Sequence, residues 1–167
     1  MQWDATANAG FTTGEPWIPV TPNYTEINAA DQVGVPGSVF EHYRALIALR
    51  HDDDAVALGS FRLLAADDPA AWVILRESPQ GGRDGGRADG GREQVLLLAC
   101  WGRDGLDLAP GSPLAARLAD EGLDLGEWSD AERVLMASLP ADEAAGSGTG
   151  APERLGGWDS VVLRRTV

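Results

Sequence analysis

The sequence predicts a mainly β protein whose C-terminal part is an antiparallel β-sandwich, preceded by a long loop and one α-helix. Three observations predict this arrangement. Residues 1–37 show neither a helical nor a strand period, residues 38–51 show a clear helical period, and from about residue 59 short apolar runs alternate with turn residues. With 167 residues, 44% of them hydrophobic, the chain can bury the core of one large domain or of one domain plus a fragment.

The first segment, residues 1–37, is predicted to be one long ordered loop. It contains Trp3, Phe11, Trp17 and Tyr24 and is punctuated throughout by proline and glycine. Disordered tails are usually poor in aromatic residues, and loops longer than about 15 residues within compact domains are mostly functional or linkers. The aromatic content favours a functional loop, and it raises the question of what these side chains pack on.

The run "SVFEHYRALIALRH", residues 38–51, predicts an α-helix. Ser38 is a candidate N-cap, and Glu41 three residues later completes the pattern of a capping box. One face of this helix is apolar and is expected to need a cover. That face carries Val39, Phe40, Tyr43, Leu46 and Ile47.

Five strands are predicted after residue 59. They correspond to the runs "SFRLLAA", "AWVILRE", "EQVLLLACW", "RVLMASL" and "WDSVVLRRTV". Between them, "SPLAARLADEGLDL" fits either one short helical turn or an irregular crossover. Two glycine-rich loops are expected, at roughly 79–93 and 141–154. Because helices do not alternate with most of these strands, an antiparallel sheet is favoured over a parallel one.

Composition narrows the partners and the compartment. The net charge is −13 and all 13 basic residues are arginine, which argues against nucleic acid and anionic membranes as partners and is neutral toward sugars. The sequence shows neither an apolar run of about 20 residues nor the pattern of a secretory signal, so the cytoplasm is the expected location. The single cysteine, Cys100, lies in an apolar run and is predicted to be a buried core thiol.

Residues 1–51 carry a dense motif pattern. The stretch "MQWD…NAGFTTGEPWI.V.PNY.EINA..Q", followed by "SVFEHYRALIALRH", resembles the C-terminal part of α-glucosidases of the oligo-1,6-glucosidase type, which belong to the α-amylase superfamily of glycoside hydrolases. This resemblance implies a (β/α)8 catalytic barrel, of which residues 1–58 would be the loop after the eighth strand and the eighth helix. Residues 59–167 would be the C-terminal β-sandwich domain. The fold implied is therefore a β-sandwich behind the remainder of a truncated barrel, and the aromatic loop would pack on that barrel.

The resemblance also bears on catalysis. Retaining glycoside hydrolysis uses two carboxylates about 5 to 5.5 Å apart. In this family those residues lie on barrel strands that would precede residue 1, so we expect no catalytic residue in this chain. His42 and His51 are too few for a histidine-based metal site, and no further cysteine or histidine stands at ligand spacing from them, so no metal ligand is expected, and no cofactor is expected either. Trp3, Asp4 and Asn8 are the candidate residues of the substrate-pocket rim, which the family's loop borders. The alternative role of Asp4 and Asn8 is to hold the loop by local hydrogen bonds, and that of Trp3 is to pack on the barrel.

Two functions are compatible with these observations. The first is a C-terminal fragment of an α-glucosidase that hydrolyses terminal α-1,4- or α-1,6-linked glucose from short oligosaccharides, with this chain lacking the catalytic carboxylates. Hydrolase, isomerase and transglycosylase relatives share the pattern, so the reaction type stays open here. The alternative is a stand-alone, non-catalytic β-sandwich module for carbohydrate binding or partner stabilisation. If the chain is such a fragment, the uncovered helix face predicts self-association. The rival expectation is that the loop folds back over the helix and gives a compact monomer, which would favour the stand-alone module.

Overall fold

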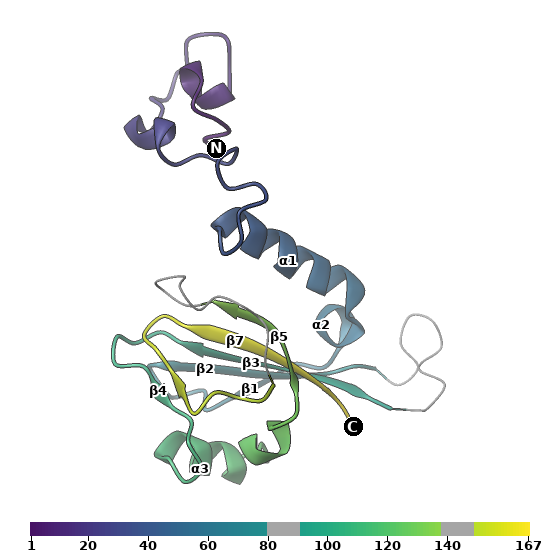
Figure 1. The fold of residues 1–167 in the computed structure, drawn as a ribbon. Coiled ribbons are helices and arrows are strands. Elements are labelled where there is room, and N and C mark those ends of the chain that lie inside the picture. The colour runs from purple at the N-terminus through teal and green to yellow at the C-terminus, as the bar shows by residue number, and fades with distance from the viewer. Residues whose placement is uncertain (80–90, 138–148) are drawn as a thin grey trace. The chain divides into compact units, whose positions relative to one another are not determined.

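The computed structural model describes residues 1–79, 91–137 and 149–167 (Figure 1). The chain divides into two compact units, Met1–Ile47 and Ala48–Val167, and the boundary falls within helix α1 (Val39–Asp52). The predicted domain boundary at residues 58 and 59 stays a prediction.

The first unit is mostly irregular, as predicted for residues 1–37. It contains two short 3-10 helices, η1 (Ala7–Gly10) and η2 (Pro22–Thr25), and the first part of α1. The N-cap of α1 is confirmed, because the backbone N–H of Glu41 donates to Ser38 Oγ at 3.2 Å. The second hydrogen bond of a capping box, from the N–H of Ser38 to the Glu41 carboxylate, was predicted wrongly. The Glu41 carboxylate instead accepts from the N–H of Gly34 at 2.7 Å. Glu41 therefore ties the helix start to the preceding turn.

The second unit is built on a five-stranded sheet in the order β1-β2-β3-β7-β5. Its strands are β1 (Arg62–Leu64), β2 (Ala71–Glu77), β3 (Glu93–Cys100), β5 (Glu132–Ala137) and β7 (Ser160–Thr166). Every pairing in this sheet is antiparallel. All five strands fall on the five predicted runs, so the antiparallel β-domain is confirmed.

The layer below this sheet is mixed. It holds a small two-stranded sheet, β4 (Leu106–Asp107) with β6 (Arg154–Leu155), together with helix α3 (Pro113–Asp120) and the short helix η3 (Leu125–Trp128) (Figure 1). The segment that fitted either a helical turn or a crossover is therefore a helix. The sandwich itself stays a prediction. Most of the two expected glycine-rich loops lies outside the described residues.

The main core lies between the large sheet and this mixed layer. Alternate strand residues supply it from above, while α3, η3 and the small sheet supply it from below. Cys100 is buried in this core, as predicted. The core includes Val73, Leu96, Leu98, Val161, Leu163, Leu114, Leu118, Trp128 and Leu155.

The opposite face of the sheet carries a second, smaller cluster. Helix α2 (Asp54–Leu58), which the sequence analysis did not anticipate, lays Ala55 on Val95 and Val162. The carboxylate of Asp53 caps α2 by accepting from the N–H of Val56 at 3.1 Å. Leu49, Ala55 and Val56 thus belong to the cluster on this face of the sheet. Within the described part of the chain, no helix is long and apolar enough to cross a membrane.

Candidate functional site

The first predicted rim residue, Asp4, closes a tight turn. Its carboxylate accepts hydrogen bonds from the N–H of Thr6 at 2.8 Å and from the Thr6 hydroxyl. The pKa of Asp4 lies below its ordinary value, because these two hydrogen bonds favour the ionised form. Gly10 passes so close that a Cβ at that position would lie 2.6 Å from Asp4 Oδ2. The Asp4 side chain therefore holds the loop, which is the structural role weighed for it.

Asn8 has a similar role from the other side of the turn. Its backbone adopts the left-handed conformation with φ of 57°, which asparagine tolerates better than most residues. Its Nδ2 donates to the carbonyl oxygens of Thr12 and Gly14, both at 3.1 Å. One amide group thus spans two carbonyls and fixes the course of the chain after η1.

Trp3 is held by its backbone. Its N–H donates to the carbonyl of Ala9, and its own carbonyl accepts from the N–H of Ala30, both at 2.9 Å. These bonds join the start of the chain to the segment that precedes α1. The indole ring is about half exposed. Trp3 therefore has a fixed backbone and a ring that remains accessible.

A hollow of about 380 Å³ opens beside this turn. Of the three predicted rim residues, Asn8 lines it, whereas Trp3 and Asp4 do not. Two aromatic residues that were not chosen as rim residues, Phe11 and Trp17, also line it, and Trp17 is 92% exposed. The signal for them was present in the sequence, since both belong to the aromatic loop. The resemblance implied that the aromatic loop, to which Trp17 belongs, packs on the catalytic barrel.

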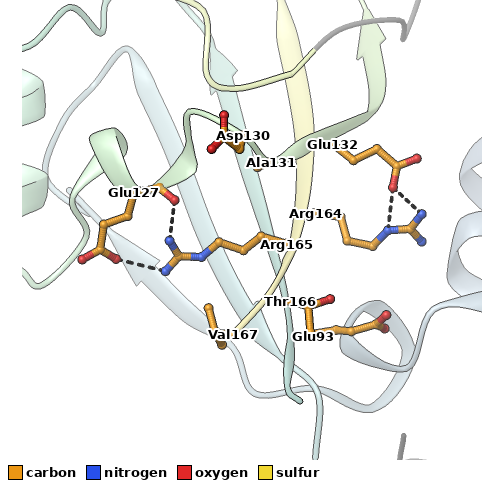
Figure 2. A pocket seen from close by; sticks show the side chains of 9 residues that line it. All are labelled: Glu93, Glu127, Asp130, Ala131, Glu132, Arg164, Arg165, Thr166 and Val167. Atoms are coloured by element: carbon orange, nitrogen blue, oxygen red, sulfur yellow. Dashed lines mark hydrogen bonds and ion pairs between the residues drawn. The ribbon is translucent and has the colours of Figure 1, made fainter. Parts of the chain in front are cut away.

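A second hollow, of about 730 Å³, lies on the second unit (Figure 2). The two arginine side chains that line it, Arg164 and Arg165, are paired with acidic residues of this chain. Arg164 Nη2 lies 2.7 Å from Glu132 Oε2, and Arg165 donates to the Glu127 carbonyl at 2.7 Å and to its carboxylate at 3.2 Å. The hydrogen bond with Glu132 raises the pKa of Arg164. These contacts give the hollow a structural character, because both guanidinium groups are neutralised from within the chain.

Three consecutive aspartates, residues 52–54, lie where α1 ends and α2 begins. Asp53 is buried, caps α2 and pairs with Arg164. Across residues 1–79, 91–137 and 149–167, no group of three or more histidine, cysteine, aspartate or glutamate side chains is placed to hold a metal ion. The candidate site is therefore the N-terminal loop with its hollow.

Comparison with known proteins shows which family this loop resembles. The family model described as "Alpha amylase, catalytic domain" matches residues 1–59. The chain is 52% identical over 76 residues to an oligo-1,6-glucosidase of Parageobacillus thermoglucosidasius, and 51% identical over 76 residues to a trehalose-6-phosphate hydrolase of Bacillus subtilis. The resemblance to α-amylase-family glycosidases is confirmed. Each match covers 46% of this chain, and the chain spans only 14% of the length of each of these relatives.

The likeness to α-amylase-family structures extends into the β-domain. The trehalulose synthase MutB from Pseudomonas mesoacidophila MX-45 matches with a TM-score of 0.67 and 32% identity. That match covers 99% of this chain and 24% of the synthase. The catalytic-domain model thus matches the loop, α1 and α2, while the structural likeness also includes the large sheet and the layer below it.

Proposed function

We propose that this chain is the C-terminal part of an α-glucosidase that removes terminal α-1,4- or α-1,6-linked glucose from short oligosaccharides. In this proposal the chain supplies the end of the catalytic domain and the following β-domain, while the catalytic carboxylates lie elsewhere in the enzyme. The cytoplasm is the proposed compartment. Hydrolysis is proposed because the curated relatives named above are hydrolases by name, an oligo-1,6-glucosidase and a trehalose-6-phosphate hydrolase.

One observation carries this proposal. The chain is 52% identical to an oligo-1,6-glucosidase over 76 residues, which is longer than the aromatic loop alone. The catalytic-domain model matches residues 1–59, which include the loop, α1 and α2. The roles of two carboxylates support the proposal that the catalytic carboxylates lie elsewhere in the enzyme. In the described residues the buried carboxylate of Asp53 is committed to capping and ion pairing, and the exposed carboxylate of Asp4 is committed to its own turn.

The N-terminal loop is the part proposed to face the substrate. Trp3, Asp4 and Asn8 would form the rim of the substrate pocket, with Asp4 and Asn8 acting through the shape of the loop. The exposed rings of Phe11 and Trp17 beside the hollow offer surfaces that can either stack on a sugar or pack on the rest of the catalytic domain.

The alternative, a stand-alone β-module that binds carbohydrate or stabilises a partner, makes a different genetic prediction. An open reading frame that runs upstream of Met1 through the remainder of an α-amylase catalytic domain supports the α-glucosidase. A promoter and a ribosome-binding site directly before Met1 support the stand-alone module.

A graft tests the proposed function biochemically. Residues 1–167 replace the equivalent region of the Parageobacillus thermoglucosidasius oligo-1,6-glucosidase, and glucose release from isomaltose is measured. We expect the graft to fold and hydrolyse isomaltose, because the exchanged segment would restore the end of the catalytic domain and its β-domain. A folded graft without activity would refute the proposal.

A further inference from the structure

Three exposed tryptophans of the second unit lie at one end of the large sheet. Trp72 is the second residue of β2, Trp101 directly follows β3, and Trp158 precedes β7 by two positions. Because these strands are antiparallel, the start of β2, the end of β3 and the start of β7 meet at the same end of the sheet (Figure 1). The exposed fractions of the three side chains are 44%, 52% and 52%. We call Trp72, Trp101 and Trp158 the tryptophan surface.

Close backbone contacts bring the three segments together. The N–H of Trp101 donates to the carbonyl of Ala70 at 2.7 Å, two residues before Trp72. A Cβ at Gly157 would lie 2.6 Å from the carbonyl oxygen of Arg103, so the missing side chain lets the turn before β7 rest directly on the segment after Trp101. The rings of Trp72 and Trp101 meet edge-on, with 5.6 Å between their centroids and 65° between their planes.

Trp158 occupies a position in its turn that glycine usually fills. The N–H of Asp159 donates to the carbonyl of Gly156 at 3.3 Å and closes the turn, in which Trp158 is the third residue with φ of 70°. Glycine or asparagine is usual there, because a bulky side chain strains left-handed backbone. Strained residues persist where the surrounding structure holds them, and they gather at ligand-binding sites. The strain at Trp158 therefore indicates a use for its ring.

The tryptophan surface lies away from the part of the sheet that α2 covers. Ala55 of α2 packs on Val95 and Val162. Trp72 pairs with Ala99, which is four residues along β3 from Val95. Four strand residues correspond to about 13 Å. The three rings therefore belong to the opposite end of β2 and β3 from the packed helix.

Charged side chains border the tryptophan surface. Arg103 and Asp104 follow Trp101 closely and are exposed, and within the described residues neither side chain has a hydrogen bond or an ion pair. The carbonyl of Asp104 accepts from Arg154 Nη2 at 2.6 Å, which fixes the course of this loop. Arg103 offers hydrogen-bond donors and Asp104 offers acceptors, and a sugar hydroxyl uses both. The buried centres of protein interfaces are instead depleted of charged residues.

We propose that the tryptophan surface binds a short oligosaccharide by stacking its rings on glucose units. This inference goes beyond the proposed function, on which the choice of glucose rests. One face of a pyranose ring presents C–H bonds that carry slight positive charge, and the face of an indole ring is slightly negative, so the two stack. An uncharged sugar is also not repelled by a chain with a net charge of −13.

The test follows the indole N–H signals of the six tryptophans by NMR while isomaltotriose is added to the 167-residue chain. Single Trp→Phe variants assign the signals. We expect the signals of Trp72, Trp101 and Trp158 to shift with one dissociation constant, on the order of 1 mM. Sorbitol, which has hydroxyl groups but no ring, is the control ligand and is expected to shift none of them. Equal shifts with sorbitol, or shifts confined to Trp3 and Trp17, would overturn the inference.

Trp158→Gly separates the role of the ring from that of the fold. Glycine adopts φ of 70° without strain, so this variant is expected to fold and yet to bind isomaltotriose at least about tenfold more weakly. Trp72→Ala removes a second ring and is expected to weaken binding similarly.

Phe61→Ala is the matched control. It removes an exposed ring near the far end of β2, since the next residue, Arg62, pairs with Leu75. Its affinity for isomaltotriose is expected to equal that of the parent chain. A folded Trp158→Gly variant with the parent's affinity contradicts the inference, and so does a Phe61→Ala variant that binds as weakly as Trp158→Gly.

Other occupants give different results. If the tryptophan surface binds a second copy of this chain, its three indole signals shift on dilution without sugar, and Trp158→Gly abolishes a dimer in light scattering. If it packs on another part of the enzyme, Trp158→Gly lowers the melting temperature of the graft, and isomaltotriose shifts none of the three signals. Either result overturns the inference.

The proposed function is tested separately by the activity of the graft. A folded but inactive graft refutes the proposed function and leaves the sugar titration of the 167-residue chain as it stands. Absence of binding to the tryptophan surface refutes this inference and leaves the activity of the graft as it stands.

Discussion

Arg164 of β7 and Asp53, the N-cap residue of α2, form an ion pair with 3.5 Å between Nη1 and Oδ2. The Asp53 side chain is 1% exposed, and within the described residues its Oδ2 has no hydrogen-bond partner. Its Oδ1 accepts from the N–H of Val56. Asp53 therefore joins the end of the segment matched to the catalytic domain to a strand of the β-domain.

This contact predicts a strong effect of removing the carboxylate. Asp53→Ala deletes both the cap and the ion pair, and breaking a buried pair typically costs about 3 kcal/mol of unfolding free energy or more. Asp53→Asn keeps an oxygen that can cap α2 and lets Arg164 keep its bond to Glu132, so we expect a loss of about 1–2 kcal/mol. Urea unfolding of the two variants and the parent gives the difference.

The matched control for this prediction is Glu132→Gln. Glu132 also binds Arg164, but its side chain is mostly exposed, so the loss is expected to stay below about 1 kcal/mol. If Glu132→Gln destabilises the chain as much as Asp53→Ala does, burial of Asp53 is not what makes its contact important.

Gly59, which follows α2, is predicted to tolerate no side chain. A Cβ at this position would lie 2.2 Å from the carbonyl oxygen of Ala55 and 2.5 Å from that of Glu77, and both belong to backbone that cannot give way cheaply. We expect Gly59→Ala to reduce the unfolding free energy by about 1–3 kcal/mol. Gly14→Ala, where the nearest atom is 3.7 Å away, serves as the control and is expected to be nearly neutral. Equal unfolding midpoints of the two variants would contradict the steric argument.

The N-terminal turn allows a paired test of its packing. Gly10 and Gly34 both have left-handed backbone, with φ of 65° and 78°, but only at Gly10 would a Cβ meet another group, the Asp4 carboxylate. Gly10→Ala is expected to disturb the turn and accelerate hydrogen exchange at the N–H of Thr6, while Gly34→Ala carries the backbone strain alone. Unchanged exchange at Thr6 in the Gly10→Ala variant would show that the turn does not depend on this close approach.

The apolar face of α1 predicts self-association of the 167-residue chain. Val39, Tyr43 and Ile47 are exposed, and large apolar side chains left in water each forgo about 1.5–3 kcal/mol of burial. Light scattering should detect oligomers or aggregates that Ile47→Glu reduces, together with binding of the dye ANS. A monodisperse monomer without ANS binding would show that this face is covered, and it would favour the stand-alone module.

The strands and the long helix were predictable because they follow simple periods. Alternation in β2 and β3 and the apolar rhythm of α1 are local properties of the sequence, and the structure places these elements within a residue or two of the prediction. Helix α2 was missed because five residues are too few to show a helical period. The two-residue strands β4 and β6 were missed for the same reason.

The candidate site was only partly predictable. Asn8 lines the hollow of the N-terminal loop, and its role at a substrate rim stays a prediction. The partners of Asn8 and Asp4 depend on left-handed backbone at Asn8 and Ala9, which no sequence period reveals. The contact between Asp53 and Arg164 joins residues more than a hundred positions apart, so it follows from the fold and not from local pattern. The resemblance, by contrast, depended on residue identities in the first 51 positions.

The 167-residue chain alone is predicted to be inactive as a glycosidase. The physical reason is that retaining hydrolysis needs two carboxylates about 5 to 5.5 Å apart at one pocket, and we assign no such pair to this chain. Purified chain is incubated with p-nitrophenyl α-glucoside, and p-nitrophenol is followed by absorbance. Turnover that scales with protein and survives repurification would place the catalytic residues within these 167 positions.

The most direct test of the central claim is the kcat/KM of the graft for isomaltose, compared with that of the unmodified Parageobacillus thermoglucosidasius enzyme. If this chain is the C-terminal part of an α-glucosidase, the two values should agree within about tenfold, since a tenfold difference is 1.4 kcal/mol of transition-state stabilisation. A graft that folds cooperatively but shows a kcat/KM at the level of the uncatalysed reaction would contradict the claim.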